Sequence, residues 1–124
     1  MDKHLLQLKY PELFPEGYCE VSISDGWVPL VDKLCAQLQR LTHRYKFKLK
    51  IVQIKEKFGG LRFYYDATDA GEGVIPIVME LIVLAEEIAS ITCEYCGKPG
   101  KLRYGSWWLT LCDECEQGRN NDKV

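Results

Sequence analysis

Four cysteines near the C-terminal end of the sequence form two closely spaced pairs. Two residues separate the cysteines within each pair, and fifteen residues separate the pairs. This spacing is typical of a four-thiolate zinc site, since one tight turn can aim both sulfurs of a pair at a single point. A structural zinc ion takes four such ligands in a tetrahedron and keeps no open position for a catalytic water. The sequence therefore predicts one structural Zn²⁺ per chain, bound by Cys93, Cys96, Cys112 and Cys115.

Two alternatives compete with zinc. Two disulfides would use the same cysteines, but a chain of 124 residues with 47% apolar residues has little need of such staples. Iron also accepts four thiolates, and the sequence does not separate it from zinc. Cysteines used as metal ligands fit a reducing compartment, and the first residues show no signal-peptide pattern. We therefore expect a cytoplasmic protein.

The residues around the cysteines predict the elements that hold them. Gly97 follows the first pair and supplies the positive φ that a tight knuckle requires. Residues 101–104 and 107–111 are typical of two short strands joined at Gly105 and Ser106. Acidic residues surround the second pair, as at the first turn of a helix, so we expect a helix from Cys112 to about Gly118. A knuckle, a hairpin and a ligand-bearing helix resemble a treble-clef zinc finger.

Upstream, hydrophobic spacing predicts one long helix and one long hairpin. Apolar residues recur at helical intervals over residues 25–45. Residues 47–66 alternate between apolar and polar, with a shift near Ile51 and Val52 that indicates a β-bulge. Gly59 and Gly60 lie between the two strands, and we expect both to adopt positive φ in a type I′ turn.

The remaining segments complete the predicted fold. Residues 18–24 alternate as a short strand. Residues 75–91 are apolar on most sides, although Pro76, Glu80, Glu86 and Glu87 interrupt them. They therefore predict a buried helix, the most buried element, and not a membrane span. We expect an α+β fold: a small antiparallel sheet with two helices on one face. Residues 1–91 would form this domain, and residues 92–124 a zinc-binding module packed on it.

Charge is distributed unevenly along the chain, although the net charge is only −2. Residues 44–62 contain seven basic residues and one acid, whereas residues 63–97 contain seven acids and no base. These two blocks either pair within the fold or present opposite charges to a partner. Neither the net charge nor the pI of about 5.7 indicates a strongly nucleic-acid-binding protein.

Two stretches together resemble a known group of proteins. They are QIKEKFGGLRFYY, residues 53–65, and CEYCGKPG followed by GSWWLTLCDEC, within residues 93–115. They resemble small bacterial proteins that phages and prophages often carry. The resemblance implies a bacterial cytoplasmic protein with metal-binding cysteines at the four positions above, and it implies no particular activity. Proteins from such mobile loci include immunity proteins, antitoxins and nucleic-acid-binding regulators, which is an argument from context.

The sequence contains no recognisable catalytic motif. His4 and His43 are the two histidines, and neither belongs to a nucleophile or metal motif. His43 falls near the expected end of a helix, where a cationic residue suits the helix dipole. Asp66, Asp69 and Glu72 are grouped after the hairpin, where we favour a solvated acidic loop over the divalent-cation site of a nuclease. We therefore expect a protein that is not an enzyme.

Binding is the remaining class of function, and a protein partner is the first hypothesis. Acidic residues after the hairpin would meet a basic partner, such as a toxin that an immunity protein or antitoxin neutralises. Adjacent tryptophans would contribute because tryptophan is enriched at interface hot spots. The candidate residues are Asp66, Asp69, Glu72, Trp107 and Trp108. A nucleic-acid-binding regulator is the alternative. It would use Lys46, Lys48, Lys50, Lys101 and Arg103.

Overall fold

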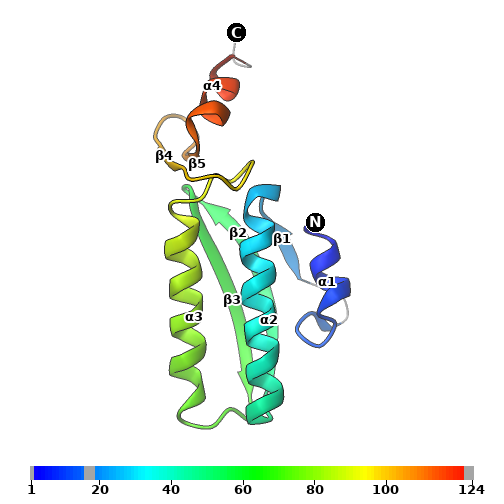
Figure 1. Cartoon of the computed structure of the whole chain (residues 1–124). Coiled ribbons are helices and arrows are strands. Elements are labelled where there is room, and N and C mark those ends of the chain that lie inside the picture. Colours follow the sequence, from blue (N-terminus) through cyan, green and yellow to red (C-terminus); the bar gives the residue numbers. More distant parts are fainter. Residues whose placement is uncertain (1, 16–18, 122–124) are drawn as a thin grey trace.

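The computed structural model describes residues 2–15 and 19–121 of the chain, so residue 18 of the predicted first strand lies outside the described residues. Figure 1 shows a body of helices and strands with a smaller C-terminal part at one end. The elements of the body are α1 (Leu5–Lys9), β1 (Glu20–Ser22), the 3₁₀ turn η2 (Asp25–Trp27), α2 (Val28–Tyr45), β2 (Lys48–Lys57), β3 (Gly60–Thr68) and α3 (Val74–Ala89). Those of the C-terminal part are β4 (Lys101–Arg103), β5 (Leu109–Leu111) and α4 (Asp113–Asn121).

The main sheet has three strands in the order β1-β2-β3. β2 and β3 form the antiparallel hairpin that alternation predicted, but β1 lies parallel to β2. The expected purely antiparallel sheet is therefore mixed. The reason is the connection: α2 carries the chain back along the sheet between β1 and β2, and strands joined by such a crossover run parallel.

The β2–β3 hairpin contains the predicted bulge, but its turn lies at other residues than predicted. Its register shifts between Ile51 and Gln53, so Val52 is the extra residue. At the other end Lys57 pairs with Gly60, which leaves Phe58 and Gly59 as the two turn residues. Their φ values are 54° and 78°, whereas Gly60 is not among the residues with positive φ. The prediction of positive φ at Gly60 was therefore wrong, because the turn lies one residue earlier.

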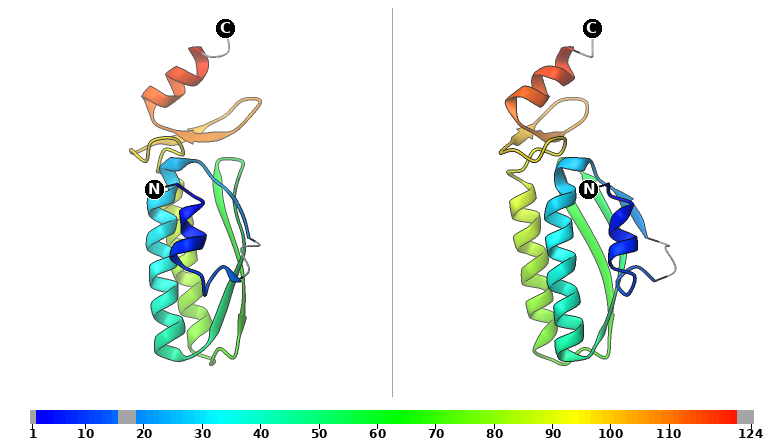
Figure 2. Two further views of the ribbon diagram at one scale, coloured as in Figure 1. Left: turned by 90° about the vertical axis from the view of Figure 1, so that its right-hand side faces the viewer. Right: turned by 45° about the vertical axis from the view of Figure 1, so that its right-hand side comes forward.

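The core lies between the sheet and the two long helices. Figures 1 and 2 show α2 and α3 side by side over one face of the sheet, as predicted, with α1 beside α2 near β1. Trp27 is fully buried at the start of α2, and Ile54 and Leu61 are buried on the strands facing the helices. These side chains belong to one cluster that runs from Leu6 to Ala89. The α+β class is thereby confirmed.

The helix expected to be the most buried element is α3, and that expectation was wrong. One of its faces packs in the core, and its members are Val74, Val78, Ile82, Ala85 and Ala89. The opposite face carries exposed apolar side chains, among them Met79 and Leu84, which are 54% and 51% exposed. Only one layer of helices covers the sheet, so nothing in the described residues lies over the outer face of α3. No helix in the described part of the chain has the length and apolarity that a membrane crossing requires.

The C-terminal part, here called the metal module (residues 92–121), contacts the body through polar groups. The Trp27 indole donates from Nε1 to the carbonyl of Thr92 at 2.9 Å. The Gly26 amide donates to the carbonyl of Glu94 at 2.8 Å. The Thr110 hydroxyl donates to the carbonyl of Gly59 in the hairpin turn at 2.7 Å. The start of α2 and the tip of the β2–β3 hairpin therefore form the platform on which the module sits.

Candidate metal centre

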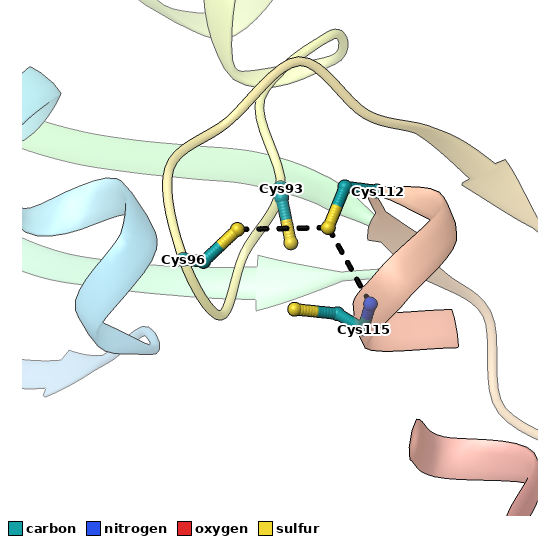
Figure 3. Close-up of side chains that lie close together, drawn as sticks. All are labelled: Cys93, Cys96, Cys112 and Cys115. Carbon is teal, nitrogen blue, oxygen red and sulfur yellow. Dashed lines mark hydrogen bonds between the residues drawn. The ribbon is translucent and has the colours of Figure 1, made fainter. Parts of the chain in front are cut away.

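The four predicted cysteines converge on one point. Their sulfur atoms all lie within 4.8 Å of one another. Figure 3 shows the four side chains directed toward a common centre, Cys93 and Cys96 from one loop and Cys112 and Cys115 from the start of α4. Among the described residues this is the one group of three or more potential ligands so arranged. Four converging thiols match the ligand set of a closed, structural metal site.

A tight knuckle positions the first pair. The Cys93 amide donates to the Lys98 carbonyl at 2.7 Å, and the Gly97 amide donates back to the Cys93 carbonyl at 3.0 Å. Gly97 has φ 84°, which confirms the prediction of a left-handed residue at this position. An isolated antiparallel bridge between Thr92 and Pro99 closes the base of the knuckle.

The first turn of a helix positions the second pair, as predicted. α4 begins at Asp113, directly after Cys112, and three acids stand in its first turn. The amide of Cys115 points at Cys112 Sγ at 3.4 Å. The β4–β5 hairpin between the two pairs is antiparallel and pairs Lys101 with Leu111. Knuckle, hairpin and helix thus follow in the predicted order.

The thiols of the cluster differ in acidity because they are so close together. Burial alone would raise the pKa of Cys93. Hydrogen bonds from the backbone N–H groups of Cys112, Cys96 and Tyr95 outweigh burial and lower this pKa to about 6. Burial and the neighbouring thiols together raise the pKa of Cys115. The protein alone therefore favours a thiolate at Cys93 and opposes one at Cys115, and a bound cation would offset the repulsion among four thiolates.

The other two cysteines lie outside the cluster, as predicted. Cys35 is fully buried on α2, and burial raises its pKa to about 12. Cys19 lies before β1, and its pKa is raised to about 11, mainly by burial. High pKa values keep both thiols protonated and poorly reactive at neutral pH.

The candidate partner-binding residues do not form a single site. Asp66 lies near the end of β3 and Asp69 and Glu72 lie in the loop before α3. This loop is at the end of the body opposite the metal module, which carries Trp107 and Trp108 (Figure 1). In the described residues the three acids are not arranged as ligands around one point. Asp66 also faces Lys50 across the hairpin, so the acidic and basic blocks meet at that pair.

An exposed aromatic cluster joins the hairpin tip to the metal module. The Trp108 ring makes edge contacts with Phe58, at 5.8 Å between centroids, and with Tyr104, at 4.8 Å. Trp107 is 67% exposed, and the Arg119 guanidinium on α4 donates to its carbonyl at 3.0 Å. The tryptophans precede β5 in a loop, whereas the sequence placed them on a strand. Phe58 was not singled out from the sequence, because no local pattern places it beside Trp108.

The two tryptophans and the hairpin tip enclose a cleft. It has a volume of about 430 Å³. Its lining consists of Glu56, Lys57, Phe58, Ser106, Trp107 and Trp108. A second hollow, of about 320 Å³, is also lined by Trp107 and Glu56, together with Glu94. Glu94 is buried and accepts a hydrogen bond from the Thr110 amide at 2.7 Å, and burial raises its pKa to about 7.

The candidate nucleic-acid-binding residues lie on different elements. Lys48 and Lys50 alternate with buried Leu49 and Ile51 and therefore point away from the helices. The same side of the sheet, here called the outer sheet face, also carries Lys55, Arg62 and Tyr64. Lys46 ends α2 in a left-handed conformation with φ 52°.

The remaining basic candidates lie on β4, and the two histidines lie on α2 and at the start of α1. Lys101 is exposed on β4, and Arg103 is engaged by Asp113, with Nη2 2.7 Å from Oδ1. His43 lies near the end of α2, as expected, and its Nε2 is 3.0 Å from a Glu12 carboxylate oxygen. His4 stands at the start of α1.

Comparisons with known proteins add no further identification. No protein-family model, curated protein or solved structure matches the chain.

Proposed function

We propose that this chain is a zinc-stabilised binding protein that has no catalytic role and acts on a partner protein. The observation that carries the proposal is the exposed aromatic cluster of Phe58, Tyr104, Trp107 and Trp108. Exposed tryptophans on a rigid scaffold are favoured at interface hot spots, since they bury a large area with little loss of side-chain entropy. Here Phe58 of the hairpin tip and Tyr104 contact the Trp108 ring, and Arg119 of α4 donates to the Trp107 carbonyl.

Zinc is the metal proposed for the four cysteines. Four thiolates suit Zn²⁺, and a site with four protein ligands contributes to folding without binding a substrate. Elemental analysis of protein purified from zinc-replete cells should find one zinc per chain. Iron in its place, or no metal, would contradict this assignment.

A basic toxin is the partner that we propose, which makes the chain an immunity or antitoxin-type protein. Support comes from the acids of the loop before α3 and of α3 itself, and from the absence of any base in residues 63–97. Asp69 and Glu72 are exposed and are not needed for the core. Replacing both with lysine should leave folding intact, slow association with a basic partner and weaken the salt dependence of the on-rate.

The test uses the protein encoded by the neighbouring gene as the candidate partner. Binding should weaken at least tenfold, about 1.4 kcal/mol, when Trp107→Ala and Trp108→Ala are combined. Tyr45→Ala removes an aromatic side chain of similar exposure, 45%, from the end of α2 and should change nothing. If the partner is a toxin, the wild-type chain should also restore growth to cells that express it.

Binding of nucleic acid is the second candidate function. The observation that favours it is the outer sheet face, which carries four basic residues and the exposed ring of Tyr64. Basic groups can contact phosphates while an aromatic ring stacks on a base. Combining Lys48→Glu with Lys50→Glu should then abolish binding to labelled DNA and RNA, whereas the Asp69 and Glu72 lysine variant should bind them more tightly. If both variants bind every candidate partner as tightly as the wild type does, the charge pattern is not the basis of either function.

A further inference from the structure

The outer face of α3 carries a regular stripe of apolar side chains. Its members follow one another at intervals of four, three, four and three residues. We call this stripe the α3 seam: Ile77, Leu81, Leu84 and Ile88 on α3, continued by Ile91 in the turn that follows the helix. Four of the five side chains are between 42% and 64% exposed, and Leu81 is half-buried. Alternating steps of four and three residues keep side chains in line along one side of a helix, as in a coiled coil.

The fold makes little use of the seam. The core is served by the adjoining face of α3, where Val78 and Ala89 are fully buried, and of the seam only Leu81 packs against it. Single exposed apolar residues are ordinary on protein surfaces. A continuous stripe of them along about three helical turns is not ordinary, and such patches mark surfaces that another molecule covers.

The charge beside the seam indicates what kind of molecule covers it. Glu80 and Glu87 are exposed, lie seven residues apart and flank the stripe. Neither belongs to an ion pair among the described residues. The nearest acids before the helix are Asp69 and Glu72, and no lysine or arginine occurs between residues 63 and 97.

A second copy of the chain is a poor occupant of this surface. Two antiparallel α3 helices packed seam to seam would bring the Glu80 and Glu87 carboxylates of one copy beside those of the other. Like charges at facing positions are destabilising. α3 also has no basic side chain that could reach across to compensate.

We propose that the α3 seam docks a basic amphipathic helix of the partner protein. This inference rests on the proposed function as a protein-binding protein, and it names the chemistry of the partner. The docked helix would carry apolar side chains at the same alternating spacing and lysine or arginine seven residues apart, opposite Glu80 and Glu87. On the helix the seam runs from Ile77 to Ile88, eleven residue steps or about 17 Å, so a partner helix of about three turns would cover it.

The test uses two synthetic helical peptides with leucine at the seam spacing. One carries lysine at the flanking positions and the other glutamate. Each is labelled and titrated with the full zinc-loaded chain by fluorescence anisotropy. The lysine peptide should bind at least tenfold more tightly than the glutamate peptide, and its affinity should fall as salt rises. Glu80→Lys with Glu87→Lys should reverse this preference.

Variants of the seam separate docking from general charge attraction. Leu84→Ser with Ile88→Ser should weaken the lysine peptide at least tenfold while circular dichroism stays unchanged, because both side chains are about half exposed. Val52→Ser is the matched control: Val52 is 43% exposed, but on the bulge of β2. It should bind like the wild type.

Several results would overturn the inference. Binding of both peptides alike, or binding that survives the seam variants, would show that the seam is not the docking surface. A dimer in light scattering that Leu84→Ser converts to monomer would show that a second copy covers it. If the seam variants still bind the natural partner while the tryptophan variants do not, only this inference fails and the proposed function stands. If the tryptophan variants also retain every partner, the proposed function fails as well.

Discussion

At the scale of single residues, Gly59 is the position where backbone and packing both exclude a side chain. Its φ of 78° disfavours any residue with a Cβ, and a Cβ there would overlap the Leu102 side chain of the metal module. Gly59→Ala should therefore lower the free energy of unfolding by about 1–3 kcal/mol. Gly60 has no such φ, and its Cβ would meet only the Lys57 carbonyl at 3.5 Å. Gly60→Ala should change stability by less than about 0.5 kcal/mol. Equal denaturation midpoints for the two variants would contradict this assignment of the turn.

The cysteines provide a second prediction at this scale. Cys112→Ser removes a ligand whose sulfur lies 3.6 Å from that of Cys96, so the metal should be lost from the purified chain. Cys19→Ser removes a thiol outside the cluster and should keep one metal per chain. Elemental analysis of both proteins measures the difference. Metal retained by Cys112→Ser at full stoichiometry would mean that three thiolates and a solvent ligand suffice.

At the scale of elements, α1 is fastened to α2 by one carboxylate. The Tyr10 hydroxyl donates to Asp32 Oδ1 at 2.6 Å, and the Lys9 ammonium donates to Oδ2 at 3.0 Å. Partial burial raises the pKa of Asp32, but these two hydrogen bonds outweigh it, so the pKa lies below its ordinary value of 3.8. A carboxyl group with a lowered pKa in the folded state stabilises the fold when it is ionised.

The pH dependence of stability follows from that direction. The contribution of Asp32 should be complete above about pH 4, its unfolded-state range, and should be lost as the pH falls through the lower folded-state pKa. Asp32→Asn should therefore reduce stability by about 1 kcal/mol at pH 7 and flatten the acid side of the stability curve. Glu72→Gln, in an exposed loop, is the control and should follow the wild type. Urea denaturation between pH 2 and 7 measures the free energy of unfolding of both proteins. If it changes with pH in the same way for the wild type and Asp32→Asn, Asp32 does not have this role.

The elements also show how far the sequence determines the structure. Local periodicity predicted the two long helices, the hairpin and the bulge, because each is encoded by which side chains face the core. The direction of β1 was missed, since it depends on the α2 crossover and not on any local pattern. The burial of α3 was overestimated because composition gives how apolar a helix is and not how many of its faces have partners.

The candidate site divides in the same way. Cysteine spacing predicted that all four thiols converge, because the geometry of a metal site constrains the spacing of its ligands directly. Of the aromatic cluster, the sequence predicted Trp107 and Trp108 as partner-binding residues but not Phe58. Phe58 joins the tryptophans through a contact between residues fifty positions apart, and such a contact leaves no trace in local spacing.

At the scale of the whole molecule, the metal module and the body have separate apolar clusters. The cluster of the body runs from Leu6 to Ala89, whereas that of the module contains only Cys93, Leu109, Leu111 and Cys112, with Cys115 packed against it. So few buried side chains cannot stabilise a module of about thirty residues without the metal. The division at residue 92 therefore predicts that metal removal acts on the two parts unequally.

Chelation of the metal provides the last prediction. Removing it should abolish amide-exchange protection in residues 93–121, since α4 has nine residues and isolated helices of that length are unstable. Protection should persist in α2 and in the β2–β3 hairpin, because their buried side chains contact the body alone. The hairpin tip should lose part of its protection, since the module that packs over Gly59 and anchors its carbonyl would no longer restrain the tip. Hydrogen exchange with mass spectrometry before and after chelation measures each segment, and re-added zinc should restore the module as the control. Loss of protection throughout the chain at once would show instead that body and module fold as a single cooperative unit.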